Sequence, residues 1–166
     1  TYETLKKQFA NREIKKTYIT IVDGWVRLDR GVINKPIGRS PKDFRRHLAG
    51  RGVRGELREA VTDYKVIKRF TSPQASPYKG EGVKFTYLEV RPKTGRTHQI
   101  RVHMKYLNHP VVCDSLYNPN GFCPKGLSRM ALHAKSIEFK NLKGEIVKVE
   151  SKVPKEIEKA CPVLNS

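Results

Sequence analysis

Five short segments with the composition of β-strands limit what this chain can fold into. Residues 17–22 are almost continuously apolar and rich in β-branched side chains, which favours a strand with both faces covered. Residues 60–70 and 83–90 also have strand character, and the Ser, Pro and Gly residues between them are typical of turns. Residues 134–140 and 145–149 flank a turn that ends in glycine. These short connections predict an α+β fold around a mainly antiparallel sheet.

Three helices are expected beside this sheet. Residues 2–10 and 97–107 carry apolar side chains at helical spacing, and the tail from Pro154 begins with a residue suited to a first helical turn. Thr94 or Thr97 is the candidate N-cap of the central helix, because a threonine hydroxyl accepts hydrogen bonds from backbone N–H groups.

Arg101 falls at the border of the apolar face of the central helix. A guanidinium in this position is partly shielded from water, so we expect it to pair with a carboxylate or a phosphate. An ordinary surface ion pair, nearly neutral in energy, is the alternative that the residues alone leave open. Arg96 and His98 lie at the start of the same helix, where backbone N–H groups favour a phosphate. For His98 a structural hydrogen bond is the competing interpretation.

The charge of the chain predicts a polyanionic partner. Lys and Arg number 34 against 16 Asp and Glu, which gives a formal charge of +18 and a pI near 10.0. Glycines and prolines interrupt residues 34–58, where we expect a flexible basic insertion that contacts the phosphate backbone of a nucleic acid. Only Phe44 is available there to stack on a base, so the segment is suited to phosphates more than to base readout. A solvated basic face without a ligand is the alternative. The insertion's Lys and Arg residues from position 39 to position 58 are Arg39, Lys42, Arg45, Arg46, Arg51, Arg54 and Arg58.

The three cysteines, Cys113, Cys123 and Cys161, show no C-x-x-C spacing. We therefore expect neither a disulfide framework nor a metal site, and we interpret each cysteine as a buried or incidental thiol. No apolar run reaches the length of about 18 residues that a membrane span requires, so no membrane partner is expected. A cytoplasmic protein is predicted.

Four short motifs follow one another along most of the chain. They are Lys16-Thr17-Tyr18; the run from Thr94 to Arg101; His109-Pro110 followed by Asp114-x-x-Tyr117; and Arg129-x-x-Leu132-His133-Ala134. In this order they resemble the RluA-type family of RNA pseudouridine synthases. The resemblance implies a pseudouridine synthase fold, present here in part, with a mixed central sheet and flanking helices and loops that line an RNA cleft.

The same resemblance implies that one catalytic residue is absent. The family's signature His-Arg-Leu-Asp-x-x-Thr-Ser-Gly carries the catalytic aspartate and is expected about thirty residues before Tyr18, whereas this sequence begins at Thr1. Residues 1–166 are thus expected to form a single catalytic domain without its N-terminal portion, and this chain alone is expected to bind RNA without isomerising uridine. Asp29 repeats the core of the signature, but different residues follow it, so we interpret it as unrelated.

The resemblance also suggests roles for individual residues. Tyr18 would stack against the target uracil, Arg101 would hold the catalytic aspartate ionised, and Leu132 would close the pocket beside the base. For Tyr18 and Leu132, ordinary core packing is the alternative. Asp114 is expected to cap a loop. The residues expected to bind the substrate are Arg96, His98, Leu132, Arg39, Arg45, Arg46, Arg51 and Arg54.

The predicted activity is the isomerisation of uridine to pseudouridine in structured RNA, ribosomal or transfer RNA, by a monomer that needs no cofactor and no metal. The base would have to be extruded from its helix to reach the enzyme. A non-catalytic RNA-binding module that keeps the synthase fold is the alternative. A basic structural protein of a ribonucleoprotein particle fits the charge, but it leaves the run from Gly95 to Arg101 unexplained.

Overall fold

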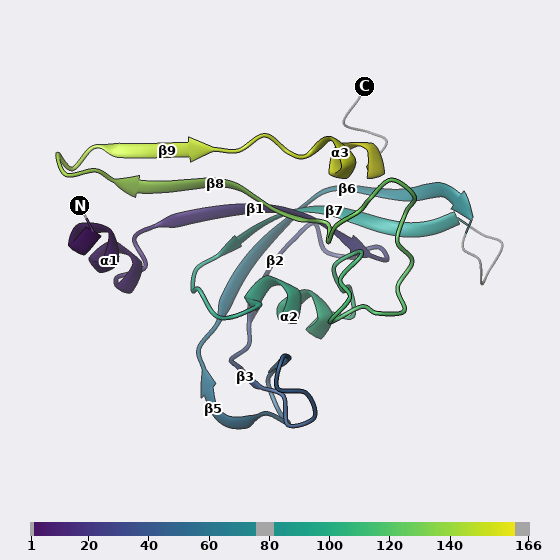
Figure 1. Ribbon diagram of the computed structural model, residues 1–166, viewed down its shortest axis with the longest axis horizontal. Coiled ribbons are helices and arrows are strands. Elements are labelled where there is room, and N and C mark those ends of the chain that lie inside the picture. Colours follow the sequence, from purple (N-terminus) through teal and green to yellow (C-terminus); the bar gives the residue numbers. More distant parts are fainter. Residues whose placement is uncertain (1, 76–81, 162–166) are drawn as a thin grey trace.

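The computed structural model describes residues 2–75 and 82–161, in which an antiparallel sheet dominates (Figure 1). Its strands lie in the order β2-β6-β7-β1-β8-β9, and each neighbouring pair is antiparallel. The predicted α+β fold with a mainly antiparallel sheet is therefore confirmed. The strands are β1 (Lys15–Asp23), β2 (Arg30–Asn34), β6 (Val61–Ala75), β7 (Gly82–Pro92), β8 (Leu132–Lys140) and β9 (Ile146–Glu150).

Residues 37–58 form a second, small sheet, so the expectation of a flexible insertion at 34–58 is wrong. Strands β3 (Ile37–Arg39), β4 (His47–Ala49) and β5 (Arg54–Arg58) pair in the order β4-β3-β5. The glycines that suggested flexibility instead close the tight turns, because Gly50 and Gly52 have φ angles of 79° and 81° that side chains rarely adopt.

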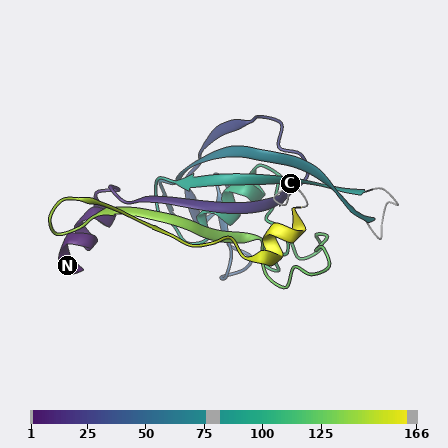
Figure 2. The same cartoon turned by 90° about the horizontal axis from the view of Figure 1, so that it is seen from above.

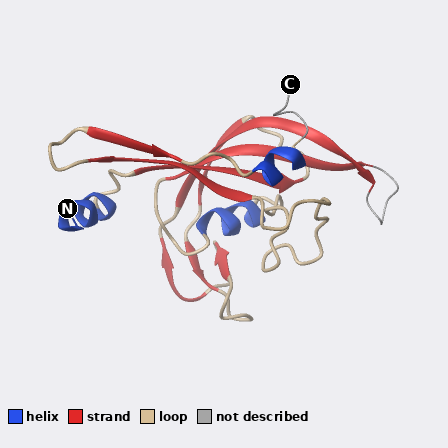
Figure 3. Ribbon diagram, turned by 45° about the horizontal axis from the view of Figure 1, so that its top comes forward, coloured by secondary structure: helices blue, strands red, loops and turns tan. Residues whose placement is uncertain are grey.

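In the part of the chain that the structure describes, three helices flank the strands. Helix α1 (Tyr2–Ala10) lies at one end of the molecule beside β8 and β9, and the hairpin of β6 and β7 extends toward the other end (Figure 2). Helix α2 (Gln99–Tyr106) lies between the main sheet and the small sheet, whereas α3 (Lys155–Ala160) lies near the opposite face (Figure 1). A long loop of residues 107–131 connects α2 to β8 (Figure 3).

Helix α2 begins later than predicted, and no threonine caps it. Its N-cap is His98, which has a left-handed φ of 54° and makes no capping hydrogen bond through its side chain. The Thr94 hydroxyl donates to Gln99 Oε1 at 2.7 Å and accepts the Val61 N–H at 3.1 Å. Thr94 therefore joins the start of α2 to strand β6.

The strand register determines which side chains face α2. Thr62 of β6 contacts His103 of α2, so even-numbered residues around Thr62, including Tyr64, point toward the helix. Tyr64 pairs with Val90 of β7, and Val90 pairs with Tyr18 of β1. Directly paired residues share a face, so Tyr18 lies on the α2 side. Leu132 lies on that side too, because it pairs with Thr20.

The core fills the space between α2 and the main sheet and continues under α3. Phe85, Leu88 and Met104 are fully buried, and Ile157 joins them from α3. In the described ranges, no helix has the length and apolar character that crossing a membrane requires.

Candidate functional site

Arg101 forms a two-pronged ion pair with Asp114 inside the protein. Its Nε donates to Asp114 Oδ2 and its Nη2 to Asp114 Oδ1, each at 2.7 Å. The side chain of Arg101 is 16% exposed and that of Asp114 is fully buried. The predicted shielding of Arg101 and its pairing with a carboxylate are therefore confirmed, and the carboxylate belongs to this chain.

Asp114 also organises the loop that follows it. Its Oδ1 accepts the backbone N–H groups of Leu116 and Tyr117, each at 3.0 Å, which confirms the predicted loop cap. Burial alone would raise the pKa of Asp114, but the hydrogen bonds from Arg101 and from these amides outweigh it and lower the pKa below its ordinary value. Asp114 is therefore a permanent anion at neutral pH.

Tyr117 connects this ion pair to the small sheet. The guanidinium carbon of Arg101 lies 4.8 Å from the centre of the Tyr117 ring, a cation–π distance. The Tyr117 hydroxyl accepts the His47 backbone N–H at 2.9 Å and lies 3.1 Å from His98 Nδ1. Burial lowers the pKa of His98, with a further contribution from Arg101. His98 is therefore a neutral hydrogen-bonding group at pH 7, as the structural interpretation requires.

A cavity of about 530 Å³ adjoins the Arg101–Asp114 pair, and we call it the Arg101 cavity. Arg101 and Asp114 lie on one side, Asn118 and Gly121 belong to the long loop, and Arg129 lies near the start of β8. The cavity thus combines a buried ion pair with a wall that is formed by a loop.

A second hollow, of about 430 Å³, lies between the small sheet and the turn before α2, and we call it the arginine cleft. Arg39 and Arg54 line it without a carboxylate partner among the described residues, whereas Arg58 pairs with Glu56. His47 Nδ1 is buried there and has no hydrogen-bond partner in the described part of the chain. The arginine cleft is lined by residues 37–39, 47, 54–56, 58 and 95–97.

Gln99 fixes the turn that carries Arg96 into the arginine cleft. Its Oε1 accepts the Arg96 backbone N–H at 2.9 Å, and its Nε2 donates to Val61 O and to Thr62 Oγ1, each at 2.9 Å. With the Thr94 hydroxyl, these bonds use the whole hydrogen-bonding capacity of a buried amide. Sequence reasoning gave Gln99 no role, although it lies inside the motif.

Comparison with known proteins identifies the family of this chain. Residues 1–106 match the family described as RNA pseudouridylate synthase. The chain belongs to this family, in its RluA-type branch. Its motif from Thr94 to Arg101 builds the start of α2, the turn at the arginine cleft and the buried cation, which agrees with the resemblance.

Two relatives and one solved structure illustrate the similarity. The chain is 34% identical over 172 residues to the ribosomal large subunit pseudouridine synthase D of Xanthomonas campestris, covering 96% of this chain and 47% of that protein. It is 36% identical over 158 residues to an uncharacterized RNA pseudouridine synthase of Bacillus subtilis, covering 95% and 47%. The human RNA pseudouridylate synthase domain containing 1 structure has a TM-score of 0.72 and 28% identity, covering 92% of this chain and 60% of that chain. The chain spans about half the length of the curated relatives it matches.

The residues expected to bind the substrate divide into several groups. Arg39, Arg54 and Arg96 meet in the arginine cleft. Arg45 and Arg46 instead both contact the Asp43 carboxylate, at 3.0 and 3.5 Å. These two cations are thus partly neutralised within the chain.

Arg51 is exposed beside the turn at Gly52 and does not line the arginine cleft. His98 lies between Tyr117 and His47, whose ring centre is 6.0 Å from that of His98. Leu132 is half-buried against the core on the α2 face of the sheet.

Tyr18 lies on the same sheet face as Leu132 but lines a different hollow from Arg101. Its hollow, of about 340 Å³, is also lined by Lys16 and Phe9. The pairing of β1 with β8 shifts register between Thr17 and Tyr18, an irregularity of the kind that re-aims side chains near functional sites. Lys16 reaches across to Thr94 O at 3.4 Å, and burial lowers its pKa.

Two other histidines make hydrogen bonds within the protein. His103 is buried between Thr62 Oγ1 and Lys35 O, and His109 Nδ1 contacts Asp23 O at 2.7 Å. Asp29, which repeats the core of the family signature, is 80% exposed and pairs with Arg69.

The expectation for the cysteines is wrong for two of them, because Cys113 and Cys123 form a disulfide. Cys161 is a buried thiol outside this disulfide, as expected. The spacing of ten residues carries no motif, and the pair forms because the loop returns to within 5.0 Å between Cα atoms. Among the described residues, no group of His, Cys, Asp and Glu side chains is arranged to hold a metal ion.

Proposed function

We propose that this chain is the RNA-binding and uridine-positioning part of a pseudouridine synthase that acts on structured RNA, with ribosomal RNA as the leading substrate. The observation that carries the proposal is the buried Arg101–Asp114 pair at the family's Gly-Arg-Thr-His-Gln-Ile-Arg motif. The name of the Xanthomonas relative supports the choice of ribosomal RNA over transfer RNA.

The isomerisation requires a carboxylate, a cation that orients it, and a platform for the freed base. In this proposal the carboxylate is an aspartate from the domain's N-terminal portion, outside the present sequence. Asp114 occupies Nε and Nη2 of Arg101, and the described residues place no hydrogen bond on Nη1. That third nitrogen is free to donate to the nucleophilic aspartate. Asp114 would then hold the guanidinium in place, so that it is preorganised for the reaction.

Tyr18 and Leu132 complete the proposed uridine site. Both point to the α2 side of the main sheet, where the extruded uracil would stack on the tyrosine ring and contact the leucine. The flipped base leaves its stack at a cost of a few kcal/mol, which contacts to the flanking backbone must offset. Uracil rotation and carbon–carbon bond formation then need no cofactor.

The arginine cleft supplies those backbone contacts. Arg39, Arg54 and Arg96 line this hollow of about 430 Å³, and none of the three forms an ion pair with a carboxylate among the described residues. Residues 34–58 thus act as a preformed phosphate-binding sheet. The proposal further includes a single domain, a monomeric state and a cytoplasmic location. The Cys113–Cys123 disulfide means that an absence of disulfides no longer supports that location.

The test uses the full-length protein that contains this chain and an RNA transcript labelled with tritium at C5 of uridine. Pseudouridine formation replaces the C5–H bond with a bond to ribose, so turnover releases tritium to water. We expect release by the wild type and at least a hundredfold slower release by Arg101→Ala. Arg91→Ala is the control, because Arg91 is 63% exposed and pairs with Glu89 on the opposite sheet face. Equal release by wild type and Arg101→Ala would refute the proposal.

A further inference from the structure

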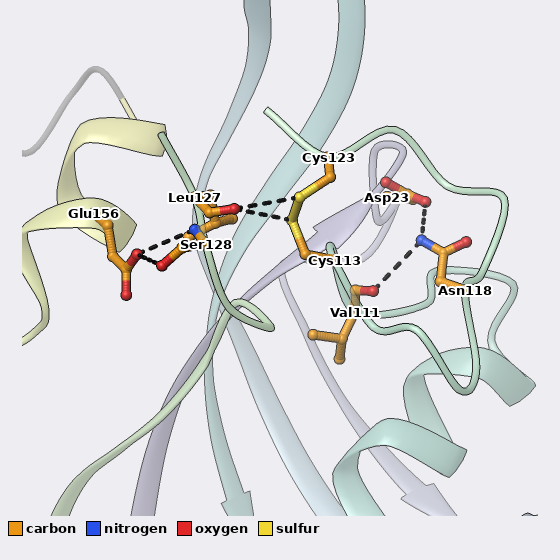
Figure 4. Close-up of a disulfide and its surroundings, with 8 residues drawn as sticks. All are labelled: Asp23, Val111, Cys113, Asn118, Cys123, Leu127, Ser128 and Glu156. Carbon is orange, nitrogen blue, oxygen red and sulfur yellow. Dashed lines mark hydrogen bonds between the residues drawn. A yellow bond between two sulfur atoms is a disulfide. The ribbon is translucent and has the colours of Figure 1, made fainter. Parts of the chain in front are cut away.

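Residues 118–128 of the long loop form one wall of the Arg101 cavity, and contacts at both ends and in the middle hold this part of the loop (Figure 4). At its start, Asn118 Nδ2 donates to Asp23 Oδ2 of β1 at 2.6 Å. At its end, the Ser128 hydroxyl donates to Glu156 Oε2 of α3 at 2.7 Å. Between these two points, the disulfide joins Cys123 to Cys113. The disulfide is thus the covalent tether at the middle of the loop.

The middle of the loop has few other backbone attachments. Its hydrogen bonds from Gly121 N to Asn118 O and from Leu127 N to Pro124 O stay within the loop itself. Phe122 adds a stacking contact, with its ring centre 6.4 Å from that of Phe85. Without the disulfide, residues 119–126 would lose their cross-link to Cys113, and only the backbone would join them to Asp114.

The two cysteine residues differ in exposure. Cys123 is exposed, whereas Cys113 is half-buried and lies next to the fully buried Asp114. An external thiolate therefore reaches the Cys123 sulfur more easily. Leu127 O lies 3.5 Å from Cys123 Sγ and 4.0 Å from Cys113 Sγ. Disulfide sulfurs have no proton to donate, but after reduction either thiol could donate to this oxygen, so the loop can accommodate the reduced state.

From this geometry we infer that Cys113–Cys123 is a thiol–disulfide exchange site whose reduction loosens the wall of the Arg101 cavity. Small thiols and dithiols are the class of reactant. The inference goes beyond the proposed function, because it stands whatever the cavity binds. It also gives a role to two cysteines that the sequence analysis interpreted as buried or incidental thiols.

The exchange takes place in two balanced steps. A thiolate of the reductant attacks Cys123 Sγ, the protein S–S bond breaks, and its electron pair leaves on Cys113 Sγ, which takes up a proton. A second reductant thiolate attacks the mixed disulfide, which releases the Cys123 thiolate and the oxidised reductant. The protein disulfide is thereby reduced, and two thiols of the reductant are oxidised to one disulfide.

Reduction should affect the loop and not the ion pair. The hydrogen bonds of Asp114 to Arg101 and to the backbone of residues 116 and 117 do not involve sulfur. Residues 119–126 should therefore exchange their amide hydrogens faster, while β1 and β7 remain protected. The cavity would open on one side with its charged residues unchanged.

Peptide mapping of the full-length protein tests whether the bond forms. Trypsin releases residues 106–125 as one peptide that contains both Cys113 and Cys123. After equilibration with glutathione disulfide, alkylation in denaturant should add no label to this peptide, and after treatment with dithiothreitol it should add two. Two labels before reduction would overturn the inference.

Two variants, each with one cysteine of the disulfide replaced by serine, test the direction of attack. Exposure to glutathione disulfide should modify Cys123 in Cys113→Ser at least tenfold faster than it modifies Cys113 in Cys123→Ser. Equal rates, or the reverse order, would contradict an entry point at Cys123.

Hydrogen exchange measures the structural consequence without using any variant. Amides of residues 119–126 should exchange at least tenfold faster in the reduced wild type than in the oxidised wild type, and those of 16–22 should not change. Cys161→Ser is the matched control, because it keeps the disulfide and should show the same response. Identical exchange of the loop in both redox states would show that the bond does not control the cavity wall.

Discussion

The Arg101 cavity and the arginine cleft both contain arginines, but the charges are neutralised in different ways. Asp114 neutralises Arg101 inside the protein, with both side chains largely removed from water. Arg39 and Arg54 line a hollow without a carboxylate partner among the described residues. An internal pair fixes the position of a cation, whereas unpaired cations remain available to a polyanion. This difference underlies the proposal that Arg101 orients the reacting groups and that the arginine cleft binds the RNA backbone.

The largest effect is expected from Asp114→Ala, which leaves a buried guanidinium without its partner. The free energy of unfolding should fall by about 3–5 kcal/mol, as is typical when one member of a buried ion pair is removed. Urea denaturation measures this loss. The matched control is Glu59→Ala, which breaks an exposed pair with Arg12 and should cost less than about 1 kcal/mol. Similar losses of unfolding free energy in the two variants would contradict the expected difference between internal and surface ion pairs.

The pH dependence of stability should identify Asp114 as the titrating group. Its pKa is lowered in the folded state relative to the ordinary value of 3.8, so its contribution is present above that value and is lost as the pH falls through the lower folded pKa. The stability difference between wild type and Asp114→Asn should therefore shrink as the pH falls below about 4. Urea unfolding of both proteins between pH 3 and 7 measures it, and a difference that grows toward acid would have the wrong sign.

A smaller loss is expected from Gln99→Ala, which removes the amide that joins the turn at Arg96 to strand β6. Buried partners left without hydrogen bonds cost about 1–3 kcal/mol of unfolding free energy. RNA affinity should fall as well, because Arg96 loses its fixed position. Unfolding and filter-binding measurements on the same variant check the two effects. Unchanged RNA affinity would contradict a role for Arg96 in binding RNA at the arginine cleft.

The smallest expected effect is a difference between Arg54→Ala and Arg45→Ala in the salt dependence of RNA affinity. Arg54→Ala should reduce the slope of log affinity for RNA against log salt by about 1, the change expected for one lost phosphate contact. Arg45→Ala should change the slope less, because Arg45 already pairs with Asp43. Fluorescence titrations of the folded variants at several salt concentrations provide the slopes. A larger change for Arg45 would place the RNA backbone outside the arginine cleft.

The elements that sequence reasoning found are those that local chemistry determines. The β-branched run at 17–22 lies within β1, and the helix around Ile100 and Met104 is present within one turn of its predicted bounds. The insertion at 34–58 was misjudged because its strands are short and depend on pairing with one another. Glycine indicates a sharp turn as readily as it indicates flexibility.

The contacts of the site were less accessible to sequence reasoning. Asp114 follows Arg101 by thirteen positions, across residues with left-handed backbone at Asn108 and Cys113, so no helical or strand periodicity links the two charges. The disulfide depends on the same return of the loop. The family motif did mark Asp114 and Tyr117, but a motif states which residues belong together and not which atoms meet.

The most direct test of the division between the two regions compares Arg101→Lys with Arg54→Lys in the full-length protein. Steady-state kinetics on a uridine-containing RNA would give kcat and KM for each. Lysine cannot reproduce the two-pronged geometry at Asp114, so Arg101→Lys should lower kcat at least tenfold with little change in KM. Arg54→Lys should keep kcat and raise KM. A loss of kcat in Arg54→Lys together with an unaffected kcat in Arg101→Lys would contradict the account.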